Sequence, residues 1–579
     1  MESRRQLDAA GTTPTGRPLI RALAALALLG WTFSLLAQPS PQTGRLATVK
    51  QLFAEQRWEQ IVREIESIPR PGAELDFYHG SALAQLGRWD DARRAFLAGH
   101  HLQPSDKRFP IELGGVAFKQ KRYSEASAWL HRGLRLDPAD SYANDFLGTV
   151  YFVQGNLQAA LKYWNRIAKP QIEEIRPEQQ LRVDPALLDR ALAFAPASTL
   201  RLPDLLTSEA RTGGLEIFSI YNFQLAARAD RKFDVVFRAQ ERDGWGSNKW
   251  EALLSVCRGI FYQTVYPEFF NWHGAAINIM SLVRWDAQKR RLAATFSAPL
   301  ERNPKRRYHV GLDLRNENWS IRPSFKGPAP ILGALNLRRE SVDGGIVSFS
   351  SGRWGWSTSA ELSHRDYRSV FLGSVLIPDV LSHGYQLKHL AQLNRELFRL
   401  PDRRLVVASS VSSQAATIWS RPRHTFEKLQ ASVSGEWFPQ MRGDDYKVQE
   451  RVRAGRTVGQ VPFDELFMLG LERDNDLWLR AHIGTRDGRK GSAPLGRNYF
   501  LSNWEIDKNV YDAGLLGVKL SPFLDTGKIT GSSAGLSSTK WLWDTGVQVK
   551  MRVLGVGGTF SYGRDLRSGH HAFYATALR

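Results

Sequence analysis

The stretch "SPFLDTGKI", residues 521–529, places one aspartate, Asp525, inside an otherwise apolar, strand-like run. An unpaired carboxylate is costly in the buried core of a soluble protein. In a membrane-spanning barrel strand, by contrast, every second side chain can face a water-filled lumen. The surroundings of Asp525 therefore decide which fold the C-terminal part of the chain adopts.

Side chains alternate between two faces through the longer run "GVKLSPFLDTGKI", residues 517–529. One face carries the apolar residues Val518, Leu520, Pro522 and Leu524, and the other carries Lys519, Ser521, Phe523, Asp525 and Gly527. The runs "HVGLDLR" (309–315) and "TGVQVKMRV" (545–553) alternate in the same way. The pattern predicts that Asp525 points into the lumen of a barrel.

From about residue 250 to the end, strand-like segments recur between polar or glycine-containing turns, and no convincing amphipathic helix interrupts them. Cys257 is accordingly interpreted as a strand residue. Most of the 18 tryptophans lie in this part, many near strand ends, as do Trp272, Trp285, Trp319, Trp437 and Trp504. Aromatic girdles at membrane interfaces explain that distribution, so we favour a transmembrane antiparallel β-barrel over a soluble β-domain.

Residues 46–170 repeat with a period of 34 residues. Small residues recur where two helices would cross, and a proline closes each unit, which is the tetratricopeptide signature. The positions are Gly80, Gly114 and Gly148; Ala92, Ala126 and Ala160; and Pro104 and Pro138. Trp58 and Pro69 indicate a degenerate repeat before them. Such helix pairs form an α-solenoid that usually holds a peptide or a partner protein.

Between residues 171 and 245 the period changes. An extended "EQQLRVD" (178–184) precedes two helical segments, "PALLDRALAF" (185–194) and "LPDLLTSEARTGG" (202–214), and two alternating strands, "IYNFQLAAR" (220–228) and "KFDVVFRAQER" (232–242). This order predicts a small α+β domain, whose edge strands could accept an extended peptide.

The passage from "TGGLEIFSIYNFQL" (212–225) to "FDVVFRAQER" (233–242) resembles a polypeptide-transport-associated (POTRA) domain, which immediately precedes the barrel in BamA/TamA-type outer-membrane assembly factors. The closing stretch "WDTGVQVKMRVLGVGGTFSYGRDL" (543–566) is similar to the penultimate strands of that family. The resemblance covers roughly residues 180–579 and leaves out the repeats. It implies a barrel of about sixteen strands, which suits the length of this region.

Barrels of this family carry a long loop that folds back inside, where its arginine pairs with an aspartate in a Phe-x-Asp-x-Gly strand. Here "FLDTG" matches that strand in Phe523, Asp525 and Gly527, and Arg480 in "LRAH" takes the place of the arginine. The resemblance therefore implies a lumen ion pair between Arg480 and Asp525. The alternative is that each is separately solvated and the two never meet.

Two features depart from the family pattern. Ala481 and His482 replace the glycine and the aromatic residue that follow the arginine, and the chain ends in Leu578 and Arg579 where such barrels often end in an aromatic. The first bears on the geometry of the loop tip, and the second weakens the assembly signal.

Lysine plus arginine exceed aspartate plus glutamate by 78 to 58, a net charge of +20 that suits nucleic acid, anionic lipid or acidic partners alike. Nucleic acid is disfavoured, because the chain has no zinc-ligand spacing, no helix-turn-helix signal and no basic helix with heptads. A single cysteine excludes an intrachain disulfide and any cysteine-built zinc site. We expect no cofactor and no metal.

The N-terminus carries several arginines before an apolar run from Ala22 to Ala37. That run is shorter than the ~20 residues of a comfortable membrane span, so it predicts a secretory signal, residues 1–37, cut after Ala37. An uncleaved signal anchor is the alternative. Because no other comparable apolar stretch follows, further membrane insertion must use strands.

One motif invites an enzymatic interpretation. "GSSAG", residues 531–535, matches the nucleophile elbow, but that chemistry needs Ser533 on a tight strand-to-helix turn, and here a polar run joins two strands. The histidine pairs 100–101 and 570–571 lack the spacing of a zinc protease. We predict no catalytic activity.

The sequence thus predicts an outer-membrane protein with repeats at 46–170 and a POTRA-like domain at 171–245, both in the periplasm, and a β-barrel at 250–579. By the resemblance, it inserts or translocates polypeptides. The expected partners are outer-membrane lipid, unfolded or extended polypeptide clients and an accessory protein at the repeats. One alternative is a passive pore or polymer exporter that uses the repeats as a scaffold, and another is a soluble periplasmic β-domain with a repeat adaptor.

Overall fold

The computed structural model describes residues 41–323, 330–374, 376–441, 443–531, 536, 540–554 and 556–578. The predicted signal sequence with its cut after Ala37, and Ser533 of the "GSSAG" motif, lie outside these residues. The chain divides into two compact units, Met1–Val116 and Ala117–Arg579. In the described parts, none of the helices combines the length and apolar composition that a membrane-spanning helix needs.

The first unit consists of helix pairs. Its helices are α1 (Pro41–Ala54), α2 (Trp58–Glu66), α3 (Ala73–Gln85), α4 (Trp89–Leu102) and the beginning of α5 (Arg108–Lys119). Gly80 of α3 faces the ring of Phe96 in α4, and an added Cβ would lie 2.6 Å from that ring. Ala92 is fully buried, and Pro104 follows the end of α4. A small residue is therefore required where these two helices cross.

The second unit continues the helix pairs with α6 (Tyr123–Leu136), α7 (Ser141–Val153) and α8 (Leu157–Trp164). The same crossing recurs two repeat lengths after Gly80: Gly148 of α7 lies against Trp164 of α8, and an added Cβ would lie 2.4 Å from the indole. Ala126 and Ala160 are fully buried. Gly114 falls within α5, and Pro138 follows the end of α6.

A small α+β domain follows, built from β1 (Ile172–Pro177), α9 (Pro185–Ala191), α10 (Leu202–Gly214), β2 (Phe218–Ala227) and β3 (Phe233–Glu241). Its sheet has the order β1-β3-β2, with β1 parallel and β2 antiparallel to β3. Phe194, Phe223, Val235 and Phe237 form part of its core. The middle strand is thus covered on both edges, and β1 and β2 are the edge strands.

The first strand of this domain was predicted at the wrong place. It spans Ile172–Pro177, and "EQQLRVD" (178–184) is irregular. The reason is that the backbone N–H groups of Arg182 and Val183 donate to the carboxylate of Glu241, at 2.6 and 2.7 Å, so a side chain replaces the ladder partner.

A helix also replaces a predicted strand. The helix α11 (Lys249–Cys257) contains Cys257, so the interpretation of Cys257 as a strand residue is wrong. Asn248 caps this helix, because its side-chain oxygen accepts from the backbone N–H groups of Trp250 and Glu251 at 3.0 and 2.9 Å. Periodicity cannot separate a short apolar helix from a strand, and only the capping residue signals it.

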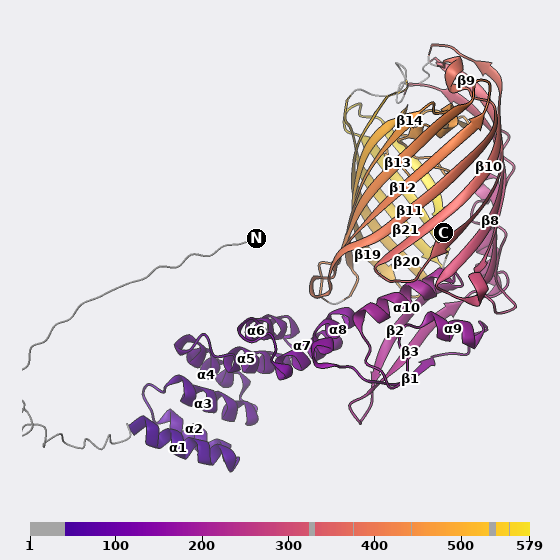
Figure 1. Ribbon diagram of the computed structural model, residues 1–579. Helices are drawn as coiled ribbons and strands as arrows, with labels where there is room; N and C mark the ends of the chain where they lie inside the picture. Colours follow the sequence, from indigo (N-terminus) through magenta and orange to yellow (C-terminus); the bar gives the residue numbers. More distant parts are fainter. Residues whose placement is uncertain are drawn as a thin grey trace, which may run out of the picture. The chain divides into compact units, whose positions relative to one another are not determined.

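The rest of the second unit is a large antiparallel sheet of many strands, which lie obliquely side by side around a curve (Figure 1). Its strands are β4 (Thr264–Val265), β5 (Glu268–Trp272), β6 (Ile277–Arg284), β7 (Lys289–Pro299), β8 (Arg306–Ile321), β9 (Gly333–Ser348), β10 (Trp354–Phe371), β11 (Gly384–Leu400), β12 (Leu405–Trp419), β13 (His424–Trp437), β14 (Tyr446–Gly459), β19 (Asn498–Asp512), β20 (Leu516–Thr530), β21 (Leu542–Val553), β22 (Val556–Asp565) and β23 (His571–Leu578). β4 and β5 both pair with β6, and β14 pairs directly with β19.

Between β14 and β19 lies a segment with only short strands. These are β15 (Phe467–Met468), β16 (Thr485–Arg486), β17 (Arg489–Lys490) and β18 (Leu495–Gly496). β15 pairs with β18, and β17 reaches β8 through Lys490 and Trp319. The segment therefore contacts a strand far from its own ends in the sheet.

The two faces of the sheet differ as the alternation predicts. On β20, Leu520 and Leu524 are 41% and 38% exposed, whereas Ser521 and Asp525 are completely buried. Trp272, Trp285, Trp437 and Trp504 are exposed, but Trp319 is buried in a cluster with Phe463, so its assignment to an aromatic girdle is wrong. Trp319 belongs to the inner face, where the segment after β14 covers it.

Candidate functional site

Residues 460–497, which we call the inward loop, make ion pairs with strands from widely separated parts of the sheet. Its acidic residues form ion pairs with cations of β6, β7, β9, β10, β11 and β13. Its residue Arg480 forms ion pairs with carboxylates of β19 and β20. Because these partners come from opposite ends of the strand order, the curved sheet wraps around the loop. The inner face of the sheet together with this loop is the candidate functional site.

Arg480 and Asp525 lie in direct contact. Arg480 Nε donates to Asp525 Oδ2 at 2.9 Å, its Nη2 donates to Oδ1 at 2.7 Å, and its backbone N–H also reaches Oδ2 at 3.1 Å. This two-pronged geometry is the strongest form of a guanidinium–carboxylate contact. The side chain of Asp525 is completely buried and that of Arg480 is 5% exposed. The pair is therefore shielded from water.

The surroundings of Arg480 satisfy the rest of its guanidinium. Nη1 donates to Gln548 Oε1 at 3.0 Å and to the carboxylate of Glu505, and the guanidinium carbon lies 3.9 Å from the centroid of the Phe523 ring. A Cβ on Gly527 would lie 3.2 Å from Leu469 and 3.3 Å from Leu479. Phe523 thus supports the guanidinium, and Gly527 leaves room for the loop.

Ala481 and His482 both contact Asp544, a residue that the sequence analysis did not single out. The backbone N–H of Ala481 donates to Asp544 Oδ2 at 2.7 Å, and His482 Nδ1 lies 3.0 Å from the same oxygen. Asp544 lies directly opposite Asp525 in the β20–β21 register. It could have been found from the sequence, since it directly precedes the alternating run 545–553 and falls on the same face as Gly546, Gln548 and Lys550.

A second anchor of the inward loop, Glu465, was also missed. Its carboxylate lies 3.0 Å from Lys388 Nζ and 3.3 Å from the nitrogens of Lys428 and Arg339, and Arg365 approaches to 3.5 Å. The four cations belong to four strands, β11, β13, β9 and β10. Glu465 therefore ties one end of the loop to a broad arc of the sheet.

A third anchor is Asp474, with Glu472 nearby. Asp474 contacts Arg284 at 2.9 Å, Arg291 at 2.6 Å and Lys490 at 3.2 Å, and Glu472 contacts Lys289 at 3.2 Å. These side chains are all at least four-fifths buried. The acidic groups of the loop thus face cations of the strands from β6 to β13, whereas Arg480 of the loop faces carboxylates of β19 and β20.

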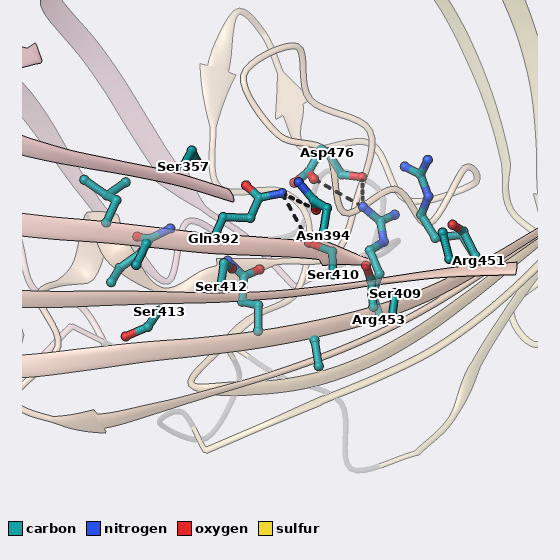
Figure 2. Close-up of a pocket in the computed structure, with 18 of the residues that line it drawn as sticks. Ser357, Gln392, Asn394, Ser409, Ser410, Ser412, Ser413, Arg451, Arg453 and Asp476 are labelled. Atoms are coloured by element: carbon teal, nitrogen blue, oxygen red, sulfur yellow. Dashed lines mark hydrogen bonds and ion pairs between the residues drawn. The ribbon is translucent and has the colours of Figure 1, made fainter. Parts of the chain in front are cut away.

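Beside the loop, part of the inner face carries no charge. Here β10 to β13 present hydroxyl, amide and small side chains, which we call the serine–amide wall: Ser357, Ser359, Gln392, Asn394, Ala408, Ser410, Ser412, Gln414, Gln430, Ser432 and Ser434. They line a cavity of about 700 Å³, seen in Figure 2 together with Arg451, Arg453 and Asp476. On β12 the wall residues share the face of buried Ala416 and Ile418, and Val411, on the opposite face, is 54% exposed.

The tetratricopeptide repeat family model matches residues 79–141, which confirms the predicted repeats there. No curated protein matches the chain. Among solved structures, the chain is similar to CdiB from Escherichia coli (16% identity, 71% of this chain and 77% of that chain, TM-score 0.47) and to BamA from Haemophilus ducreyi lacking POTRA domains 1–3 (11% identity, 70% and 84%, TM-score 0.40).

Proposed function

We propose that this chain is an outer-membrane β-barrel protein that inserts or translocates polypeptides. The observation that carries the proposal is an apolar outer face around an ionic interior in which the inward loop is held by buried ion pairs. Such an outer face is stable only in a membrane, because proteins with exposed leucine and valine along many strands would aggregate in water. The proposal assigns the chain no catalytic activity.

Closure of the sheet into a barrel of about sixteen strands is part of the proposal. It is supported by the hydrogen-bonding order, in which β23 and β4 are neighbours. The hydroxyl of Tyr262, just before β4, donates to the carbonyl of Ala575 in β23. Closure also follows from the membrane, since an open sheet edge would leave backbone groups unsatisfied in hydrocarbon.

The small α+β domain is assigned to the periplasm as a POTRA-like module. It touches a turn of the sheet, because the backbone N–H of Asp184 donates to the carbonyl of Gly274 at 2.8 Å. The side chains of Asn278 and Arg307 donate to the carbonyl of Leu215, both at 3.1 Å. An extended client that adds to edge strand β1 or β2 would thereby lie beside one end of the barrel. The repeats would hold the client or an accessory protein.

The second candidate is a passive pore or polymer exporter, and the cavity of about 700 Å³ beside the loop favours it. Deletion of residues 171–245 separates the two. The assembly function predicts that the deleted protein still reaches the outer membrane and conducts ions but no longer inserts or secretes its client. A passive pore predicts unchanged export. Cross-linking from β2 and from the repeats in the intact chain identifies what these modules hold.

A further inference from the structure

We propose that the cavity along the serine–amide wall is an open passage beside the seated inward loop, and that Arg451 makes it selective for anionic groups. The passage would admit small anions and extended polypeptide segments that carry acidic rather than basic side chains. This inference rests on the proposed outer-membrane placement, and it deepens the proposed function by naming the route and the preferred chemistry of the client.

The wall itself has no preference for charge. Every side chain that β10 to β13 contribute to the cavity is neutral, and Gln392 already bonds to Asn394 and Ser410 at 2.9 and 3.2 Å (Figure 2). Hydroxyl and amide groups both donate and accept hydrogen bonds, so they can follow a hydrated peptide backbone in any register. Leu390 is the one large apolar side chain that the described parts of β10 to β13 add to the cavity, so a passing chain has little apolar surface to adhere to.

The cavity continues along the loop. A second cavity of about 410 Å³ shares Ser434, Arg451, Arg453 and Asp476 with the first, and it extends past Arg480 to Glu436 and Lys550. The two cavities therefore form one hydrophilic space along the inner face.

Two arginines of β14 enter this space, and they differ in their partners. Arg453 donates to the backbone carbonyl of Asp476 at 2.8 Å, pairs with its carboxylate at 3.3 Å and reaches Asn503 at 2.9 Å. Arg451 is exposed, and among the described residues no hydrogen bond or ion pair to its guanidinium is found. With Arg453 matched by Asp476, Arg451 is the charge that sets the sign of the potential in the first cavity.

The test measures ion selectivity of the intact, purified protein in a planar lipid bilayer under a KCl gradient. We expect wild type to prefer chloride over potassium by about threefold or more, since one fixed charge in a narrow aqueous space is only partly screened. R451E should prefer potassium. The matched control is R456E on the same strand: Arg456 pairs with Leu429, which is exposed on the outer face, so this variant should retain the chloride preference.

A second arm separates free ions from a chain. Extended glutamate-rich and lysine-rich peptides of equal length are added, and the acidic peptide should block the wild-type current more strongly, with the order reversed in R451E. Equal reversal potentials in wild type, R451E and R456E would overturn the proposal, as would no current in wild type or equal block by both peptides. These outcomes do not depend on the insertion or secretion of a client after deletion of residues 171–245. The two experiments can therefore refute the proposed function and the proposed passage separately.

Discussion

Replacing Arg480 with methionine tests whether the inward loop depends on its buried contact with Asp525. The change keeps much of the stem that covers Phe523 but removes both nitrogens that contact Asp525, at 2.9 and 2.7 Å, and the donor to Gln548 at 3.0 Å. Asp525, completely buried, then keeps only backbone and amide donors, including Asn503 at 2.8 Å. Breaking a buried pair in this way costs about 3–5 kcal/mol.

A double-mutant cycle isolates the pair. R480M, D525N and the double variant are unfolded with urea in detergent micelles, and tryptophan fluorescence reports the free energy of unfolding. Because the two side chains are in contact, we expect the double variant to lose less than the sum of the single losses, with a coupling of about 1–3 kcal/mol. R456Q, on the outer face of β14, should change stability by less than about 0.5 kcal/mol.

Additive single losses, or losses as small as that of R456Q, would refute the reasoning. The charge swap R480D/D525R should not restore stability, although a simple pair of opposite charges would predict that it does. The new carboxylate at position 480 would lie beside Glu505, and the new guanidinium at position 525 would face the amide donor of Asn503 and the backbone N–H that now contacts Asp525. Full rescue by the swap would mean that these neighbours contribute nothing.

Three further predictions concern separate parts of the chain. Glu465→Gln leaves its surrounding cations without a full counter-charge, so the loop should become protease-sensitive in detergent, with a loss of about 3–5 kcal/mol on urea unfolding. Gly148→Ala forces a methyl group against Trp164 and should cost about 1–3 kcal/mol by helical circular dichroism, whereas Gly44→Ala, with open space around it, should cost nothing. Burial raises the pKa of Asp76 to about 6, so the folded repeats hold a proton that the unfolded chain has already released, and their stability should fall as pH rises from 4 to 7. Burial also raises the pKa of Glu112 in α5, so Asp76→Asn should weaken that dependence in thermal melts without abolishing it.

The alternation in β20 could be predicted from the sequence because one physical constraint acts on every residue of the strand. An exposed outer face on one side and the inward loop on the other impose a period of two without exception from Leu520 to Gly527. The repeats were predictable for a similar reason, since the close approach of Gly80 to Phe96 and of Gly148 to Trp164 admits no larger side chain. Both signals are local.

Other features depend on contacts that no local pattern encodes. Glu465 meets Arg339, Lys388 and Lys428, which are separated from it by many residues and belong to three strands, so only the curvature and register of the sheet bring them together. Trp319 has the sequence context of an interfacial tryptophan, yet the loop residue Phe463 covers it at a ring distance of 5.2 Å. The loop that buries Trp319 is itself placed by the same distant ion pairs.

The distribution of charge explains why the inward loop adopts one position on the inner face and why a cavity remains beside it. Its acidic anchors Glu465 and Asp474 meet cations, and its basic anchor Arg480 meets Asp525, so a loop displaced around the inner face would bring like charges together in a buried setting. Such repulsion selects one arrangement against its alternatives. Further along β10 to β13 the serine–amide wall offers neither sign, so no anchor can bind there, and that side of the interior stays open.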